Sequence, residues 1–525
     1  SPTILDMTTY NLSIRGNYTG TGRLSFSSGA FNIGGSYTNT GTFTCGTGTV
    51  NYCSASAQTV RGVNYYNLTF SNAGDKHLQA SATVGIASTF TRGSMVVTAG
   101  IGSTVTFNGA SPVMTGIATT FTNLTVTTGS LSAPSDLTVT GNLITTTPGT
   151  LNMSSYTLNL TGNYTGTGAL AFSSGTFNIS GSYTNTGTFT CWTGTVDYNG
   201  SGAQTVRGVN YNNLTFSNVG TKTLQASRTI GIAGTFTRGT MTVTPGAGNT
   251  VIFNGNVQTM TGAATTFTNL TVASTSLTSP DNFTVGSTFS TSGTATLNMG
   301  SNTLNVTGNY TGTGNLSLTS GTFNLSGAFT NTGTFTCGTG TVNYAGNAAQ
   351  TVRGVNYYDL TFSGTGAKTL QTAATIGIAG TFTRGTMTVT PGATTTVIFN
   401  GAAQVMTGSA TTFRNLTLNN TSLTIPADIT VSTTLTFTTG NIITNAFNVL
   451  MATGATVSRT SGHVIGNLRK NVATGSNVSR TFEVGTGSDY TPLTFIFTSV
   501  STAGNLTAAS TTGDHPSIGT SGFNT

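Results

Sequence analysis

Short apolar–polar–apolar triplets recur along the chain and alternate with stretches of Gly, Asn, Ser and Thr. Residues 151–296 contain, among others, Phe177–Ile179, Val196–Tyr198 and Leu214–Phe216. An apolar residue at every second position is the pattern of a β-strand that buries one face, and Gly and Asn favour turns between strands. The pattern therefore predicts strands of about three to five residues. It predicts almost no helix, because no 3.6-residue apolar period occurs.

The triplets belong to a long repeat that occurs three times, with a period of 146 residues and no insertion or deletion in its landmarks. The landmarks are GNYTGTG (Asn17, Asn163, Asn309), QTVRGVN (Arg61, Arg207, Arg353), TFTRG (Arg92, Arg238, Arg384) and TFTC (Cys45, Cys191, Cys337). Self-similarity at a fixed period indicates stacked structural units. Copies this similar also argue against one unique active site.

The repeat divides the chain into modules at residues 1–150, 151–296 and 297–456, the last of which includes the start of a fourth copy. From 457 the character changes, because basic residues come close together and Leu493, Phe495 and Phe497 alternate as in a longer strand. We expect 457–525 to be a separate, small and incomplete β region. The first copy begins almost at the first residue with no leader or capping segment, so we expect an internal piece of a longer protein.

Two all-β architectures fit many short, evenly spaced strands: an antiparallel β-sandwich and a parallel β-solenoid. The adjacent stretches 150–168 (TLNMSSYTLNLTGNYTGTG) and 169–187 (ALAFSSGTFNISGSYTNTG) have equal length and the same pattern. A repeat of coil length inside the long repeat favours the solenoid. We therefore predict a parallel β-solenoid (β-helix) rod of three modules, with coils of roughly 18–22 residues and like residues stacked in register.

Charge is sparse, since charged residues make up 5% of the chain and the formal net charge is +7. Nine of the 17 basic residues lie at repeated positions, three per module: Arg61, Lys76, Arg92, Arg207, Lys222, Arg238, Arg353, Lys368 and Arg384. These dilute charges do not form the cluster that binding to nucleic-acid phosphates requires. We expect them to be solvated and to protect exposed strand edges, with no nucleic-acid partner. No apolar run reaches the length of a membrane span.

The acidic residues and histidines argue against catalysis. Asp136 and Asp428 correspond to Asn282, and Asp/Asn exchange is tolerated in a turn but not at a catalytic base. The three histidines have no counterparts in the other copies: His77, His463 and His515. We therefore expect no enzymatic activity, no cofactor and no metal site.

The repeated cysteines Cys45, Cys191 and Cys337 follow a Phe by two residues and are expected on the same, inward face. The simplest interpretation is a small buried apolar residue, and the alternative is a covalent link between neighbouring rods. They cannot bond to one another, because equivalent sites stand a module apart. Cys53 occurs in the first copy alone and could meet Cys45.

Several phrases resemble very long, secreted Thr/Gly/Asn-rich repeat proteins of Bacteroidota. They are GNYTGTG, FNGNVQTMTGAATTFTNLTV, NNLTFSNVGTKTLQA, NVSRTFEVGTGSDYTPLTF and GDHPSIGTSG. The resemblance implies an extracellular β-solenoid adhesin or filament exported by the type IX secretion system, although no sorting domain is visible. It implies no particular ligand.

Three classes of function follow: a structural surface protein, a module that binds polysaccharide or ice along a flat face, and a β-helix enzyme. We favour the first, a stalk, adhesin or filament subunit on a bacterial surface, and keep the binding module as the alternative. Its expected partners are further copies of itself, other cell-surface proteins or polysaccharide. The candidate surface contacts are Arg61, Arg207, Arg353, Arg92, Arg238 and Arg384.

Overall fold

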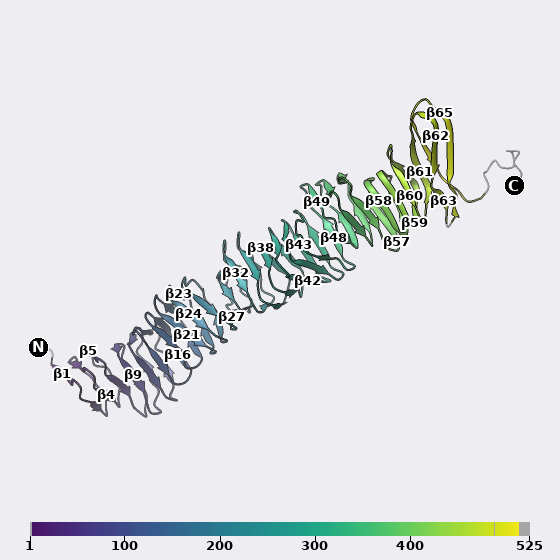
Figure 1. Ribbon diagram of the computed structural model, residues 1–525. Coiled ribbons are helices and arrows are strands. Elements are labelled where there is room, and N and C mark those ends of the chain that lie inside the picture. The colour runs from purple at the N-terminus through teal and green to yellow at the C-terminus, as the bar shows by residue number, and fades with distance from the viewer. Residues whose placement is uncertain (1–2, 488, 514–525) are drawn as a thin grey trace. The chain divides into compact units, whose positions relative to one another are not determined.

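The computed structural model describes residues 3–487 and 489–513 (Figure 1). Every regular element among these residues is a β-strand, and none of them lies in a helix. The chain divides into two compact units, Ser1–Thr268 and Asn269–Thr525. Each unit is a stack of coils whose strands pair in parallel with those of the next coil. The predicted all-β class and the parallel β-solenoid are confirmed.

A coil in the first unit has three faces, each built from one short strand. In the second module the first face includes β22 (Leu158–Leu160), β25 (Thr176–Ile179), β27 (Thr195–Tyr198), β30 (Asn213–Phe216) and β33 (Phe236–Arg238). The second face consists of β28 (Gln204–Val206), β31 (Lys222–Leu224) and β34 (Val243–Thr244). The third face includes β29 (Asn210–Tyr211), β32 (Thr229–Ile232) and β35 (Thr250–Phe253).

The inward residues of successive strands stack on like residues. Val196 pairs with Phe177 in the coil before it and with Leu214 in the coil after it. All three are buried, as alternation predicts for the inward face. Paired residues are separated by 18 positions between β27 and β30 and by 22 between β30 and β33. The predicted register is confirmed, and the parallel pairing excludes the β-sandwich alternative.

Aromatic rings form a continuous column inside the first face. The ring centroids of Tyr198 and Phe216 are 6.1 Å apart, and those of Phe216 and Phe236 are 5.3 Å apart. Both pairs are close to perpendicular, at 81° and 87°. Edge-to-face contacts of this kind add to the gain from burying the rings, so the column stabilises the stacking of coils.

The second unit repeats the arrangement. Its first face includes β46 (Thr322–Leu325), β48 (Thr341–Tyr344), β51 (Asp359–Phe362) and β54 (Phe382–Arg384). The second face includes β49 (Gln350–Val352) and β52 (Lys368–Leu370), and the third includes β50 (Asn356–Tyr357) and β53 (Thr375–Ile378). Two longer strands follow, β58 (Thr411–Thr424) and β59 (Ile429–Met451).

Pairing changes from parallel to antiparallel near the end of the second unit. β61 (Val464–Val472) still pairs in parallel with β59, but it pairs antiparallel with β66 (Gly504–Ala508). β62 (Gly475–Phe482) and β65 (Leu493–Val500) pair antiparallel in a two-stranded sheet (Figure 1). The longer strand expected at Leu493–Phe497 is confirmed. The predicted module boundaries and the incompleteness of 457–525 stay predictions, and residues 514–525 lie outside the described residues.

Candidate functional site

The phrase QTVRGVN forms a corner of the coil, where β28 ends and the chain passes through Arg207 into β29. Gln204, the first residue of β28, is buried, and its Nε2 donates to the carbonyls of Ile179 (2.9 Å) and Gly181 (2.8 Å) in the preceding coil. The equivalent bonds in the other modules are made by Gln58 and Gln350. The glutamine therefore anchors the strand that leads to the arginine.

Two buried tyrosines hold the backbone of Arg207. The N–H of Arg207 donates to the Tyr198 hydroxyl at 3.0 Å, and the Tyr211 hydroxyl donates to the Arg207 carbonyl at 2.8 Å. The two hydroxyls are 2.9 Å apart. Burial raises the pKa of Tyr198 to about 12 and that of Tyr211 well above its usual value, so both hydroxyls keep their protons at neutral pH. Equivalent circuits occur around Arg61 and Arg353.

The side chain of Arg207 reaches back across the preceding coil. Its Nη1 donates to the Tyr183 hydroxyl at 2.9 Å, and its Nη2 donates to the Gly187 carbonyl at 2.8 Å. The guanidinium carbon lies 4.9 Å from the centre of the Tyr183 ring, within the range of a cation–π contact. Arg207 is half-buried, and it connects two coils while part of its guanidinium stays at the surface.

The same contacts recur in the other modules with one change. Arg61 donates to the Tyr37 hydroxyl at 3.1 Å and lies 5.0 Å from its ring. Arg353 lies 4.9 Å from the ring of Phe329, which has no hydroxyl. The Nη1 of Arg353 is consequently buried without a hydrogen-bond partner. The sequence contained a signal for this site, since an aromatic residue precedes each arginine by 24 positions, but we did not identify it.

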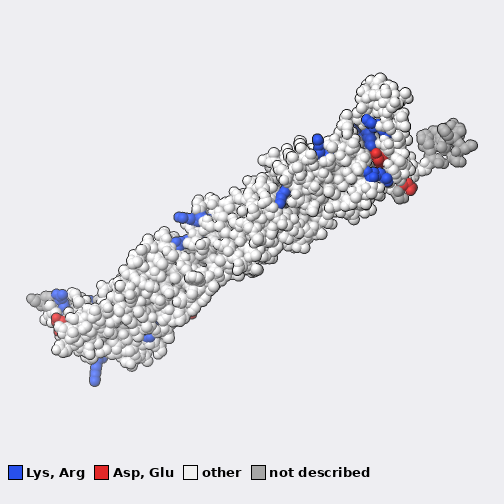
Figure 2. Space-filling view, in the orientation of Figure 1, with Lys and Arg blue, Asp and Glu red and all other residues white. Residues whose placement is uncertain are grey.

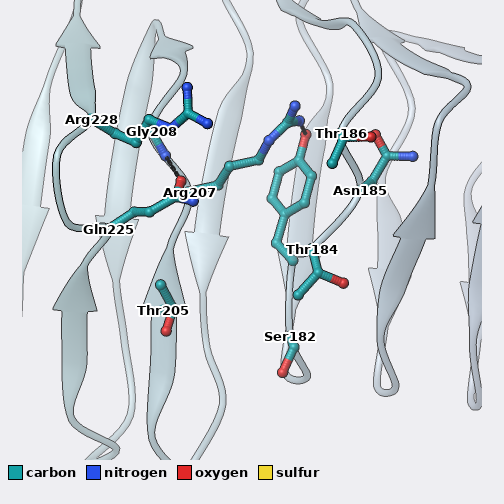
Figure 3. Close-up of a pocket in the computed structure, with 10 residues that line it drawn as sticks. Ser182, Thr184, Asn185, Thr186, Thr205, Arg207, Gly208, Gln225 and Arg228 are labelled. Atoms are coloured by element: carbon teal, nitrogen blue, oxygen red, sulfur yellow. Dashed lines mark hydrogen bonds between the residues drawn. The ribbon is translucent and has the colours of Figure 1, made fainter.

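A surface hollow of about 370 Å³ lies beside Arg207 (Figure 3). Arg207 and Arg228 lie on one side of it, and Ser182 and Thr205 on the other. The third module has a hollow at the equivalent positions, with a volume of about 520 Å³, beside Arg353. Both hollows are lined by hydroxyl, amide and guanidinium groups. These residues do not form an enclosed apolar cavity of the kind that binds drug-sized ligands.

Carboxylates do not neutralise this site. Among the described residues, neither Arg207 nor Arg228 forms a salt bridge. The ion pair found there joins Lys470 to Glu483, at 2.6 Å. Figure 2 shows a face that is mostly uncharged, with isolated charged side chains along the coils and a group of them near the C-terminal end. The hollow in the second module therefore combines two positive charges with neutral hydrogen-bonding groups.

Arg92, Arg238 and Arg384 are not surface contacts, and the prediction that placed them outward is wrong. Each is 8% exposed and lies inside the coil. Arg238, for example, donates from Nη2 to the Met241 carbonyl at 2.6 Å and from Nη1 to the Ala264 carbonyl. The reason is alternation, because Arg238 follows the inward Phe236 by two residues in β33 and so shares its face.

The repeated lysines are also buried, although we expected them to be solvated. Lys76, Lys222 and Lys368 are each 0% exposed. The Nζ of Lys222 donates to the Gly200 carbonyl at 2.8 Å and to Gln204 Oε1 at 2.7 Å. Burial lowers the pKa of all three lysines. Their ammonium groups bond to carbonyl oxygens and so connect coils.

The cysteines are free thiols. Cys45 and Cys337 are buried, as expected of small inward residues, and Cys191 is half-buried. Burial raises the pKa of each of these three thiols, which disfavours the reactive thiolate. The Cys53 thiol donates to the Ile33 carbonyl at 3.4 Å and forms no disulfide with Cys45.

Groups of three or more His, Cys, Asp or Glu side chains with metal-binding geometry are not found in residues 3–487 and 489–513. The same part of the chain contains no helix long and apolar enough to cross a membrane. The arrangement at Arg207 can hold an anion or a polar ligand, but it offers no nucleophile paired with a base.

Comparisons with known proteins give no family. No family model, curated protein or solved structure matches the chain. The function therefore has to be argued from the residues and their geometry.

Proposed function

We propose that this chain is a non-catalytic structural protein of a bacterial cell surface, which serves as a stalk, adhesin or filament subunit. The observation that supports this most is that the repeated polar side chains hydrogen-bond within the solenoid itself. The buried lysine, arginine, glutamine and tyrosine residues of each module hydrogen-bond to backbone groups of the coils. Residues committed in this way stabilise stacked coils and are not free to act on a substrate.

The extracellular location and the export route are part of the proposal. They are supported by the phrases that resemble secreted Bacteroidota repeat proteins, which imply type IX secretion. The expected partners are other copies of the chain, other surface proteins or polysaccharide. Near-identical modules present the same lateral groups several times, so weak contacts with such a partner add up.

Of the two alternative ligands, the structure favours polysaccharide over ice. Binding to ice requires the same outward residue in every coil, but one outward column of the first module runs Gly85, Thr106, Thr125 and Ile144. The polar hollows beside Arg207 and Arg353 fit the hydroxyl-rich surface of a saccharide better.

Immunolabelling of intact cells of the source bacterium, with antibodies against the purified chain, tests the location and the surface role. We expect labelling of intact cells and its loss in a strain without the gene. Labelling that requires permeabilised cells would contradict the proposal. The non-catalytic part is tested separately: degradation of a glycan by the purified chain, abolished by changing a single Asp, would contradict it.

A further inference from the structure

Arg228 converts the hollow of the second module into a site that differs from its equivalents. Ala82 and Ala374 occupy this position in the other modules, so the exposed guanidinium is present in one copy only. The stem of Arg228 packs over Gly208, where a side-chain carbon on Gly208 would lie 2.3 Å from the Cβ of Arg228. Gln225 fixes this corner by accepting the N–H of Gly208 at 2.8 Å. Arg228 and Arg207 line the same hollow.

The two arginines have unused hydrogen-bonding capacity. A guanidinium carries five N–H groups, of which Arg207 uses one for Tyr183 and one for Gly187. The remaining donors of Arg207 and those of Arg228 have no acceptor among the described residues. Arginine donors of this kind bind carboxylate or sulfate oxygens in charge-assisted bonds.

We propose that the hollow beside Arg207 and Arg228 binds a carboxylate or sulfate group of an acidic polysaccharide. This inference rests on the proposed surface role, and it names the ligand of one site. The exposed Thr184, Thr186 and Thr205 line the same hollow and supply hydroxyls for the sugar rings. The two arginines without carboxylate partners, set among neutral hydroxyl and amide groups, favour an anionic, hydroxyl-rich ligand.

Binding of defined glycans to the purified chain tests the site. The probes are polygalacturonate and chondroitin sulfate as acidic polysaccharides, dextran as the neutral one, and galacturonic acid and sodium sulfate as free anions. Isothermal titration at low and at raised salt gives the affinity and the number of sites. We expect tight binding of an acidic polysaccharide that weakens with salt, weaker binding of the free anions, and none of dextran.

Three variants separate the site from general charge. Arg228→Ala introduces the residue that the other modules have, so it should fold normally and weaken binding by about tenfold. Arg414→Ala removes one exposed positive charge in the second unit and should leave binding unchanged. Ala374→Arg should add a second strong site beside Arg353.

Four results would overturn the inference: no binding of acidic polysaccharide, equal binding of dextran, free anions that bind as tightly as the polysaccharide, or Arg228→Ala with unchanged affinity. None of these would affect the proposed surface role, which is tested by labelling cells. Loss of surface labelling with binding intact would instead contradict the surface role alone.

Discussion

The Tyr183 hydroxyl accepts a hydrogen bond of 2.9 Å from Arg207, whereas Phe329 at the equivalent position leaves Arg353 Nη1 buried without a partner. A buried donor without an acceptor costs about 1–3 kcal/mol. At this position the third module therefore has a buried donor without an acceptor, whereas in the second module that donor is paired.

We predict that Phe329→Tyr stabilises its coils by about 1 kcal/mol, because the new hydroxyl accepts the bond from Arg353. Tyr183→Phe is the matched control and should destabilise the second module by a similar amount. Hydrogen exchange of peptides that cover residues 329–353, or 183–207 for the control, measures both effects. Equal exchange rates in Phe329→Tyr and wild type would show that the unpaired donor has no cost.

Buried tyrosine pairs should make the solenoid sensitive to strong alkali. Burial raises the pKa of Tyr198 and Tyr344 to about 12, above the usual tyrosine value of about 10. A pKa that is higher in the folded state contributes stability that is complete below pH 10 and is lost as the pH rises through 12. We therefore expect the paired tyrosines to ionise only as the coils unfold.

Tyrosinate absorbance and far-ultraviolet circular dichroism, recorded on the same pH series, check this. The buried lysines have the opposite effect on stability, since burial lowers their pKa. As the pH rises they lose their charge and the cost of burying that charge is relieved, but this gives no tyrosinate signal. Ionisation of all tyrosines near pH 10 with an unchanged dichroism spectrum would refute the prediction.

Asp197 interrupts a ladder of asparagines on the outer surface of the first face. The equivalent Asn51 and Asn343 donate to the asparagine of the preceding coil at 3.2 and 3.1 Å. Asp197 has no such donor when ionised, and its Oδ1 is buried without a partner. Burial raises the pKa of Asp197, although the Ser217 hydroxyl and the charge of Lys222 lower it.

Asp197→Asn should therefore stabilise the second module by about 1 kcal/mol at neutral pH. Because the carboxyl pKa is raised, the cost of burying the Asp197 charge is absent below about pH 4. This cost develops as the pH rises through the folded-state pKa. The advantage of the variant should thus disappear in acid. Thermal unfolding of both proteins at pH 3 and pH 7 measures this, and a gain that is equal at both pH values would contradict the explanation.

The buried ammonium of Lys222 connects two successive coils, and its loss should be costly. Lys222→Met keeps the aliphatic stem but leaves the Gly200 carbonyl without its ammonium donor. Gln204 Oε1 also loses the ammonium and keeps only the N–H of Gly200. We expect a loss of about 2 kcal/mol in the free energy of unfolding, since hydrogen bonds to charged groups contribute roughly this much. Denaturant unfolding of Lys222→Met, compared with the exposed Arg414→Ala, checks the value. Equal midpoints would show that the buried bonds are not stabilising.

The sequence by itself determined the fold class, the parallel stacking and the register of the coils. The reason is that period-two alternation and a coil-length repeat are local properties, and both are visible in triplets such as Phe177–Ile179 and Val196–Tyr198. Alternation also predicts that Arg238 points inward, because it follows an inward Phe by two residues. Its charge led us to expect it at the surface instead.

The tertiary structure alone decided which charges are buried and where a ligand could bind. Lys222 is buried because the carbonyl of Gly200, 22 residues earlier, lies beside it in the preceding coil. Arg207 and Arg228 lie at one hollow because they are 21 positions apart, about one turn of the coil, and Gly208 leaves room for Arg228. Contacts between coils depend on how each corner turns, and the spacing of residues along the chain does not specify that geometry.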